Sequence, residues 1–143
     1  MKNYQNHQVL IIDDNFTLRH LLKIYLKAAG FVILEAENGK AGYDMARIHQ
    51  PNLIITDYEM PVMDGMETCQ ALKSNVRTRE IPIVLLSSFP FTPEMIKEFN
   101  ALGVDSYKMK PCDLDELIKL CNELIGRRPQ PLEIIETPPV GYL

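Results

Sequence analysis

Short apolar runs recur along this sequence, and their spacing restricts its fold more than any other feature. The runs do not alternate apolar with polar residues, as strands with one solvent-exposed face do. They are therefore typical of strands that are buried on both faces of a parallel sheet. The predicted strands are residues 9–12, 31–34, 53–55, 81–86 and, with a weaker pattern, 106–109.

Segments with a helical spacing of apolar residues lie between these runs. Three of them are followed by a glycine, at Gly30, Gly103 and Gly126, where the end of a helix favours a residue that tolerates positive φ. Thr92 supplies an N-cap, and Asp113 begins a pattern that resembles a capping box. The predicted helices are residues 18–29, 39–49, 64–74, 92–102 and 113–125.

Five strands that alternate with five helices predict an α/β fold. The sheet would be doubly wound and parallel, with helices on both faces, because right-handed crossovers leave few other arrangements. A chain of 143 residues is long enough for one such domain. In open sheets of this kind, ligands bind beyond the carboxyl ends of the strands. The polar side chains predicted to lie at that edge are those of Asp13, Asp14, Asp57, Ser87 and Lys110.

These side chains suit phosphoryl transfer. Carboxylates about 4 Å apart repel by roughly 4 kcal/mol per pair at an effective dielectric constant of about 20, and one lysine does not offset three of them. A hard divalent cation does, and clustered aspartates favour Mg²⁺. We expect Asp57 to attack a phosphorus atom in line, while the cation and Lys110 balance charge on the phosphoryl oxygens and Ser87 donates a hydrogen bond.

In combination and in this order, the motifs resemble a known family. The Asp13-Asp14 pair, Asp57 in the stretch DYEMPVMDG, Ser87, and Lys110 in the stretch YKMKP are similar to the CheY-like receiver domain of two-component response regulators. The resemblance covers residues 7–126. It implies a flavodoxin-like, three-layer α/β/α fold with the strand order 2-1-3-4-5.

The resemblance also implies a role for each residue. Asp57 is the phosphoacceptor, Lys110 contacts the phosphoryl group and Ser87 is the switch hydroxyl. Tyr107 occupies the position of an aromatic residue that changes rotamer on activation. Glu59 also places a long acidic side chain beside the pocket, which we expect to influence the lifetime of the phosphoryl group. The implied Mg²⁺ ligands are Asp13, Asp14, Asp57 and the backbone carbonyl of Glu59.

Partners follow from the same resemblance. The phosphoryl donor is a phosphohistidine on a sensor histidine kinase or a histidine phosphotransfer protein. The readout is a shifted face formed by the helix at 92–102, the strand at 106–109 and the helix at 113–125. That face would bind a downstream effector protein or form a homodimer. Such a chain is not an enzyme for other substrates, because it mediates only its own phosphorylation and dephosphorylation.

Composition argues against other partners. The net charge is −4 and basic residues do not cluster, which argues against direct binding of nucleic acid or of a membrane surface. The longest apolar runs are far shorter than the roughly 18 residues of a membrane span. Three cysteines without metal-type spacing favour a reducing cytoplasm over a disulfide framework.

Composition changes after Gly126. Residues 127–143 contain four prolines, at Pro129, Pro131, Pro138 and Pro139, which disfavour a continuing helix. We therefore expect a receiver domain over residues 1–126 and a proline-rich tail or linker over residues 127–143.

Two alternatives belong to other functional classes. A phosphohydrolase of the haloacid-dehalogenase type also uses an aspartate, a hydroxyl and a lysine at strand ends. It prefers a second aspartate two residues after the nucleophile, which Glu59 only approximates, and a cap insertion that no segment supplies. The other alternative is a pseudo-receiver that binds partners without phosphorylation, which the complete set of site residues disfavours.

Overall fold

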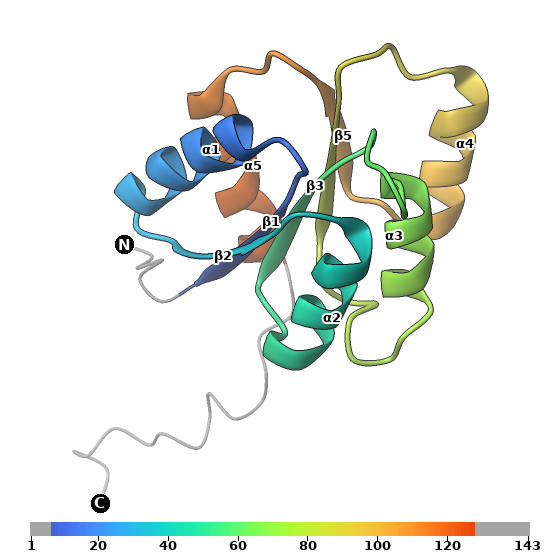
Figure 1. The fold of residues 1–143 in the computed structure, drawn as a ribbon, viewed down its shortest axis with the longest axis horizontal. Helices are drawn as coiled ribbons and strands as arrows, with labels where there is room; N and C mark the ends of the chain where they lie inside the picture. The colour runs from blue at the N-terminus through green and yellow to red at the C-terminus, as the bar shows by residue number, and fades with distance from the viewer. Residues whose placement is uncertain (1–6, 128–143) are drawn as a thin grey trace, which may run out of the picture.

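Five parallel strands form one sheet in the computed structural model, which describes residues 7–127. The strand order is β2-β1-β3-β4-β5, so the predicted order 2-1-3-4-5 is confirmed. Figure 1 shows this sheet between two layers of helices. The strands are β1 (Gln8–Ile12), β2 (Val32–Ala36), β3 (Leu53–Asp57), β4 (Ile83–Ser87) and β5 (Ser106–Met109).

A helix follows each strand along the chain, which confirms the predicted doubly wound α/β class. In Figure 1, α1 and α5 lie together on one face of the sheet, and α2, α3 and α4 lie on the other. None of the helices within residues 7–127 combines the length and the apolar character needed to cross a bilayer. The helices are α1 (Phe16–Ala28), α2 (Gly39–His49), α3 (Gly65–Lys73), α4 (Pro93–Leu102) and α5 (Leu114–Arg127).

Each face of the sheet has its own apolar core. In β1, Val9 and Ile11 belong to the core beneath α1 and α5, whereas Leu10 and Ile12 belong to the core beneath α2, α3 and α4. Successive side chains of a strand point to opposite faces, and here both faces are covered. A continuous apolar run, rather than an alternating one, is the sequence pattern that this arrangement requires.

The two edge strands differ from the prediction. All residues of β3 and β4 are buried, but most of β2 and β5 is only half-buried. Val32 in β2 is 42% exposed and Met109 in β5 is 45% exposed. Burial on both faces is therefore confirmed for the central strands and wrong for β2 and β5. An edge strand has a neighbouring strand on one side only, and the helix layers cover it incompletely.

Most of the predicted helix ends are confirmed. The Oγ1 of Thr92 accepts a hydrogen bond from the backbone nitrogen of Met95 at 3.1 Å, as an N-cap does. Gly30 and Gly103 adopt φ values of 102° and 80° after α1 and α4. Asp113 accepts a hydrogen bond from the backbone nitrogen of Glu116 at 3.1 Å at the start of α5. These local signals set the ends of three helices.

Several boundaries differ by one or two residues from the predicted ones, and two of the differences have a clear physical reason. Helix α5 continues through Gly126 to Arg127, because the apolar face that includes Ile125 keeps its last turn packed and a glycine inside a helix is only mildly unfavourable. Strand β4 begins at Ile83 rather than at residue 81, because Pro82 has no backbone N–H to donate to a neighbouring strand.

Gly65 allows α3 to start directly beside the end of β3. Its backbone nitrogen donates a hydrogen bond to the carbonyl of Tyr58 at 2.8 Å, which closes the β3–α3 loop. A Cβ atom at this position would lie 2.7 Å from the carbonyl oxygen of Asp57 and 2.7 Å from the Cα of Tyr58. Both atoms are backbone and have little freedom to move. The glycine is therefore required by close approach rather than by its φ angle.

We predict that Gly65→Ala lowers the free energy of unfolding by about 1–3 kcal/mol, the usual cost of forcing an extra methyl group into a packed site. Urea denaturation followed by circular dichroism measures this change. The matched control is Gly126→Ala, which adds a methyl group at an exposed position inside α5. The control should be neutral or stabilising by up to about 1 kcal/mol. Equal urea midpoints for the two variants would contradict the close-approach argument.

Candidate functional site

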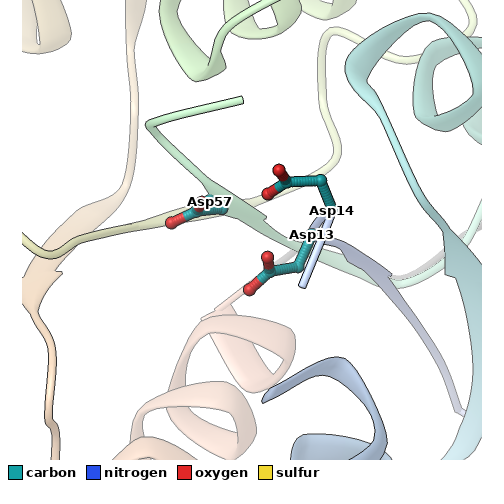
Figure 2. Close-up of side chains that lie close together, drawn as sticks. All are labelled: Asp13, Asp14 and Asp57. Atoms are coloured by element: carbon teal, nitrogen blue, oxygen red, sulfur yellow. The ribbon is translucent and has the colours of Figure 1, made fainter. Parts of the chain in front are cut away.

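Three aspartates meet at the carboxyl edge of the sheet. Asp13 and Asp14 follow β1, and Asp57 is the last residue of β3, which pairs with β1 in parallel. One carboxylate oxygen from each lies within 4.8 Å of the others, and Figure 2 shows the three side chains gathered there. Asp13 is 2% exposed and Asp57 is 6% exposed, whereas Asp14 is exposed to solvent. The predicted convergence of these residues is thus observed.

Lys110 supplies the ammonium group of this cluster. It follows β5, and its Nζ lies 2.7 Å from Oδ1 of Asp57 and 3.4 Å from Oδ2 of Asp13. The backbone nitrogen of Lys110 donates a hydrogen bond to the carbonyl of Ser87 at 2.7 Å, and the peptide bond to Pro111 is cis. The lysine is therefore anchored at its backbone to β4 while its side chain reaches the aspartates from β1 and β3.

The electrostatics of the cluster favour cations. Burial raises the pKa of Asp57 to about 6, and the charges of Asp13 and Glu59 act in the same direction against the opposing hydrogen bond from Lys110. Burial by itself would lower the pKa of Lys110, but the hydrogen bond to Asp57 and the charge of Asp13 raise it above its usual value. The lysine thus stays charged, and it does not fully neutralise the carboxylates around it.

The donor set fits a hard divalent cation. Oδ1 of Asp57 is buried and, apart from its ion pair with Lys110, accepts no hydrogen bond of regular geometry from the described residues. A buried carboxylate whose one cationic partner is shared with a second carboxylate is costly, and a divalent cation reduces that cost. Carboxylate oxygens with no nitrogen or sulfur ligand in the cluster match the preference of Mg²⁺.

Ser87 lies at the same edge, but its hydroxyl is already bound by another residue. It is buried at the end of β4, and its Oγ lies 2.5 Å from Oε2 of Glu59. The other carboxylate oxygen of Glu59 accepts a hydrogen bond from the backbone nitrogen of Ser88 at 2.8 Å. The sequence placed the Glu59 side chain beside the pocket but did not predict this contact. The role predicted for its backbone carbonyl stays a prediction.

Tyr107 lies in β5, outside the acidic cluster. Its half-buried ring packs edge-on against Phe91 at 5.0 Å and at a tilt against Phe99 at 5.5 Å between ring centroids. Phe91 belongs to the loop between β4 and α4, and Phe99 belongs to α4. The aromatic group therefore joins β5 to α4 close to the end of β4 that holds Ser87.

Two positioning residues were not predicted. The N-cap of α1 is Asn15, whose side chain accepts a hydrogen bond from the backbone nitrogen of Leu18. Its backbone nitrogen donates to Oδ1 of Asp13 at 2.9 Å. Arg19 donates to the backbone carbonyl of Asp13 at 2.6 Å and pairs with Glu35. Asn15 was recognisable as a capping residue type, whereas the contact of Arg19 depends on tertiary structure.

The family follows from a comparison of the sequence with known proteins. The sequence model described as "Response regulator receiver domain" matches residues 9–122. The chain belongs to this receiver domain family. The strand order and the carboxyl-edge cluster agree with that assignment, so the resemblance found in the sequence is confirmed.

Curated relatives of the receiver domain are longer proteins. The DNA-binding dual master transcriptional regulator RpaA of Synechocystis sp. is 34% identical over 120 residues, which cover 84% of this chain and 49% of the relative. Histidine kinase P4 of Formosa agariphila is 41% identical over 122 residues, which cover 83% of this chain and 9% of the relative. The receiver domain therefore spans about half, or much less, of the length of these relatives.

Solved structures agree with the fold. The chemotaxis protein CheY4 of Vibrio cholerae has a TM-score of 0.77 and is 28% identical, and the match covers 83% of this chain and 98% of that one. The receiver domain of the Francisella response regulator 1452 has a TM-score of 0.77 and is 28% identical, with 85% and 98% covered. The receiver domain is thus a phosphoacceptor signalling module. Neither the phosphohydrolase alternative nor the pseudo-receiver alternative is favoured.

We predict that Asp57→Asn stabilises the folded protein at pH 7 without divalent cations. The folded state holds a proton on Asp57 up to about pH 6, whereas the unfolded chain releases it near pH 4. The stability contributed by this proton is complete below about pH 4 and lost as the pH rises through about 6. The variant should therefore gain about 1–3 kcal/mol at pH 7, a gain that shrinks toward pH 4.

Thermal melts in EDTA between pH 4 and pH 8 measure this difference. The matched control is Asp44→Asn on α2, where the hydrogen bond from Lys40 lowers the carboxyl pKa. This control should not raise the melting temperature. If the difference in melting temperature between wild type and Asp57→Asn grew as the pH was lowered, that result would contradict the proposed cost of burying the Asp57 charge.

Proposed function

We propose that this receiver domain accepts a phosphoryl group on Asp57 from a phosphohistidine of a sensor histidine kinase or a histidine phosphotransfer protein. The placement of Asp57 is the observation that carries the proposal. Its buried carboxylate combines a raised pKa, two neighbouring aspartates and an ammonium group 2.7 Å away. A surface loop acid would have none of these. A site of this kind is suited to forming an acyl phosphate rather than to capping a helix.

In the transfer, a carboxylate oxygen of Asp57 forms a bond to phosphorus while the bond from phosphorus to the donor imidazole breaks, and the imidazole keeps the electron pair. Lys110 lies where it can balance negative charge on the phosphoryl oxygens, and its backbone bond to β4 holds it there. A largely apolar cavity of about 330 Å³ lies beside Asp13 and Lys110, and we propose that the donor side chain approaches the site from there.

The residues proposed to hold Mg²⁺ are Asp13, Asp14, Asp57 and the backbone carbonyl of Glu59. A bound Mg²⁺ supplies positive charge that offsets the carboxylates and the phosphoryl oxygens. Asp13 is oriented for this role by its hydrogen bonds, because Asn15 donates to its side chain and Arg19 donates to its backbone carbonyl.

We further assign the switch to Ser87 and Tyr107. A phosphoryl group on Asp57 would attract the Ser87 hydroxyl, and the ring of Tyr107 would change rotamer among Phe91 and Phe99. The face altered in this way is formed by α4, β5 and α5. It would bind a downstream effector protein or a second copy of the chain.

The wider assignment covers activity, location, partners and domain bounds. The domain acts on its own acyl phosphate and not on other substrates, and we place it in the cytoplasm. It makes no direct contact with nucleic acid or membrane. Residues 1–126 form the receiver domain, and residues 127–143 form a linker or tail. Of the tail, the structure describes Arg127 alone, as the last residue of α5. Relatives named as transcriptional regulators are consistent with an effector domain elsewhere in a longer protein.

Incubation with Mg²⁺ and acetyl phosphate, followed by intact-mass spectrometry, tests the acceptor. We expect one phosphoryl adduct that is labile to acid and base, requires Mg²⁺ and is absent from Asp57→Asn. Asp44→Asn should form the adduct as wild type does, because Asp44 lies on the exposed surface of α2. An adduct that persists in Asp57→Asn would show that another residue is the acceptor.

Thermal melts with and without MgCl₂ test the cation site separately. A cation at a hundred times its dissociation constant stabilises the folded state by about 2.7 kcal/mol, which is a rise of several degrees in melting temperature. Asp13→Asn should lose most of this rise, and EDTA should reverse it in wild type. KCl of equal ionic strength is the control for screening. A rise that KCl reproduces would contradict a specific site.

A further inference from the structure

Glu59 bridges the two loops that border the acidic cluster. It lies in the β3–α3 loop, two residues after Asp57, and both of its carboxylate oxygens accept hydrogen bonds from the end of β4. The contacts are 2.5 Å from Oε2 to Oγ of Ser87 and 2.8 Å from Oε1 to the backbone nitrogen of Ser88. This is a two-point contact with an anion, made by one hydroxyl and one amide.

The hydroxyl of Ser87 has one proton to donate. The carbonyl of Phe89 also lies within reach, at 2.9 Å. The carboxylate of Glu59 is both closer and charged, so it holds the proton. The remaining capacity of the hydroxyl is used as an acceptor from the backbone nitrogen of Phe89 at 3.0 Å. While Glu59 stays in place, Ser87 has no proton left for another acceptor.

A phosphoryl group on Asp57 would need the same donors. Its oxygens are anionic and would lie at the carboxyl edge where β3 and β4 run side by side, with Asp57 paired with Leu86 directly before Ser87. The negative charge of Glu59 also acts on Asp57, so the two carboxylates are electrostatic neighbours. The Ser87 hydroxyl has one proton, so it cannot donate a hydrogen bond to a carboxylate and to a phosphoryl group at the same time.

We propose that the Glu59 carboxylate is an internal competitor of the phosphoryl group for Ser87 and Ser88. This inference rests on the proposed phosphorylation of Asp57. In the unmodified protein, Glu59 satisfies both donors and holds the end of β4 in its resting position. Phosphorylation displaces the carboxylate into solvent. The stronger the Glu59 contact, the less a phosphoryl group on Asp57 shifts the equilibrium from the resting to the activated conformation.

The contact is placed where it can affect the readout face. Ser88 is followed three residues later by Phe91, whose ring packs against Tyr107 at 5.0 Å. Release of Ser87 and Ser88 from Glu59 therefore frees the backbone that leads to this aromatic group and to the start of α4. Glu59 is a positioning residue in this scheme, because it acts on the switch through Ser87.

Beryllofluoride with Mg²⁺ is the probe for the test, because it coordinates a carboxylate and presents three fluorine atoms in the tetrahedral arrangement of a phosphoryl group. Its affinity is measured by ¹⁹F NMR titration for wild type, Glu59→Ala, Ser87→Ala and the double variant. Alanine at position 59 keeps the backbone carbonyl. Removing the competitor should tighten binding about tenfold in the wild-type background, the factor expected for one hydrogen bond to a charged group.

The increase in beryllofluoride affinity caused by Glu59→Ala must depend on Ser87. In the Ser87→Ala background, the change at position 59 should tighten binding less than about threefold, because only the Ser88 amide is then released. An equal gain in both backgrounds would mean that Glu59 acts by charge repulsion alone, and no gain in the wild-type background would mean that it does not compete. Either result overturns the proposal.

Two controls complete the test. Glu94→Ala removes an exposed acid from the first turn of α4 and should change the affinity less than about twofold, because it leaves the donors at Ser87 and Ser88 untouched. A gain there as large as that of Glu59→Ala would overturn the proposal. Wild type that fails to bind beryllofluoride would instead overturn the proposed phosphorylation of Asp57. If Glu59→Ala does not fold, the same cycle is measured with Glu59→Gln, which removes the charge and keeps the size.

Discussion

Repulsion among carboxylates at the carboxyl edge of the sheet is the constraint on which the rest of the site depends. The parallel order of β1 and β3 places Asp13 and Asp57 side by side, and both are almost fully buried. One ammonium group, that of Lys110, lies within 4 Å of them among the residues that the structure describes. Folding thus concentrates more negative charge than the nearby residues neutralise, and this imbalance is the physical basis of the proposed cation site.

The four loops at this edge fall into two pairs, one that carries fixed charges and one whose side chains contact each other. The segments after β1 and β5 supply fixed charge. Arg19 donates a hydrogen bond to the backbone carbonyl of Asp13, and the backbone nitrogen of Lys110 donates one to the carbonyl of Ser87. The segments after β3 and β4 meet through the Glu59 contact with Ser87, and the second of them leads to the aromatic packing of Phe91. The Glu59 contact thus links the loop that follows Asp57 to the loop that leads to α4.

Much of this structure could be predicted because its determinants are local. Apolar runs mark the central strands, caps such as Thr92 mark helix starts, and parallel topology alone brings Asp13 and Asp57 to one edge. The exposure of β2 was not predictable, because its sequence resembles that of the buried strands and only its place at the edge differs. The contact between Glu59 and Ser87 was missed for a related reason. It depends on how two loops, 28 residues apart in the chain, sit relative to one another.

The sheet also separates the molecule into two cores that share only strand backbones. Leu10 contributes to one and Ile11 to the other, although the two residues are adjacent. A change of side-chain volume beneath α1 and α5 is screened from the packing beneath α2, α3 and α4 by the intervening layer. Core substitutions in one helix layer should therefore be tolerated independently of those in the other.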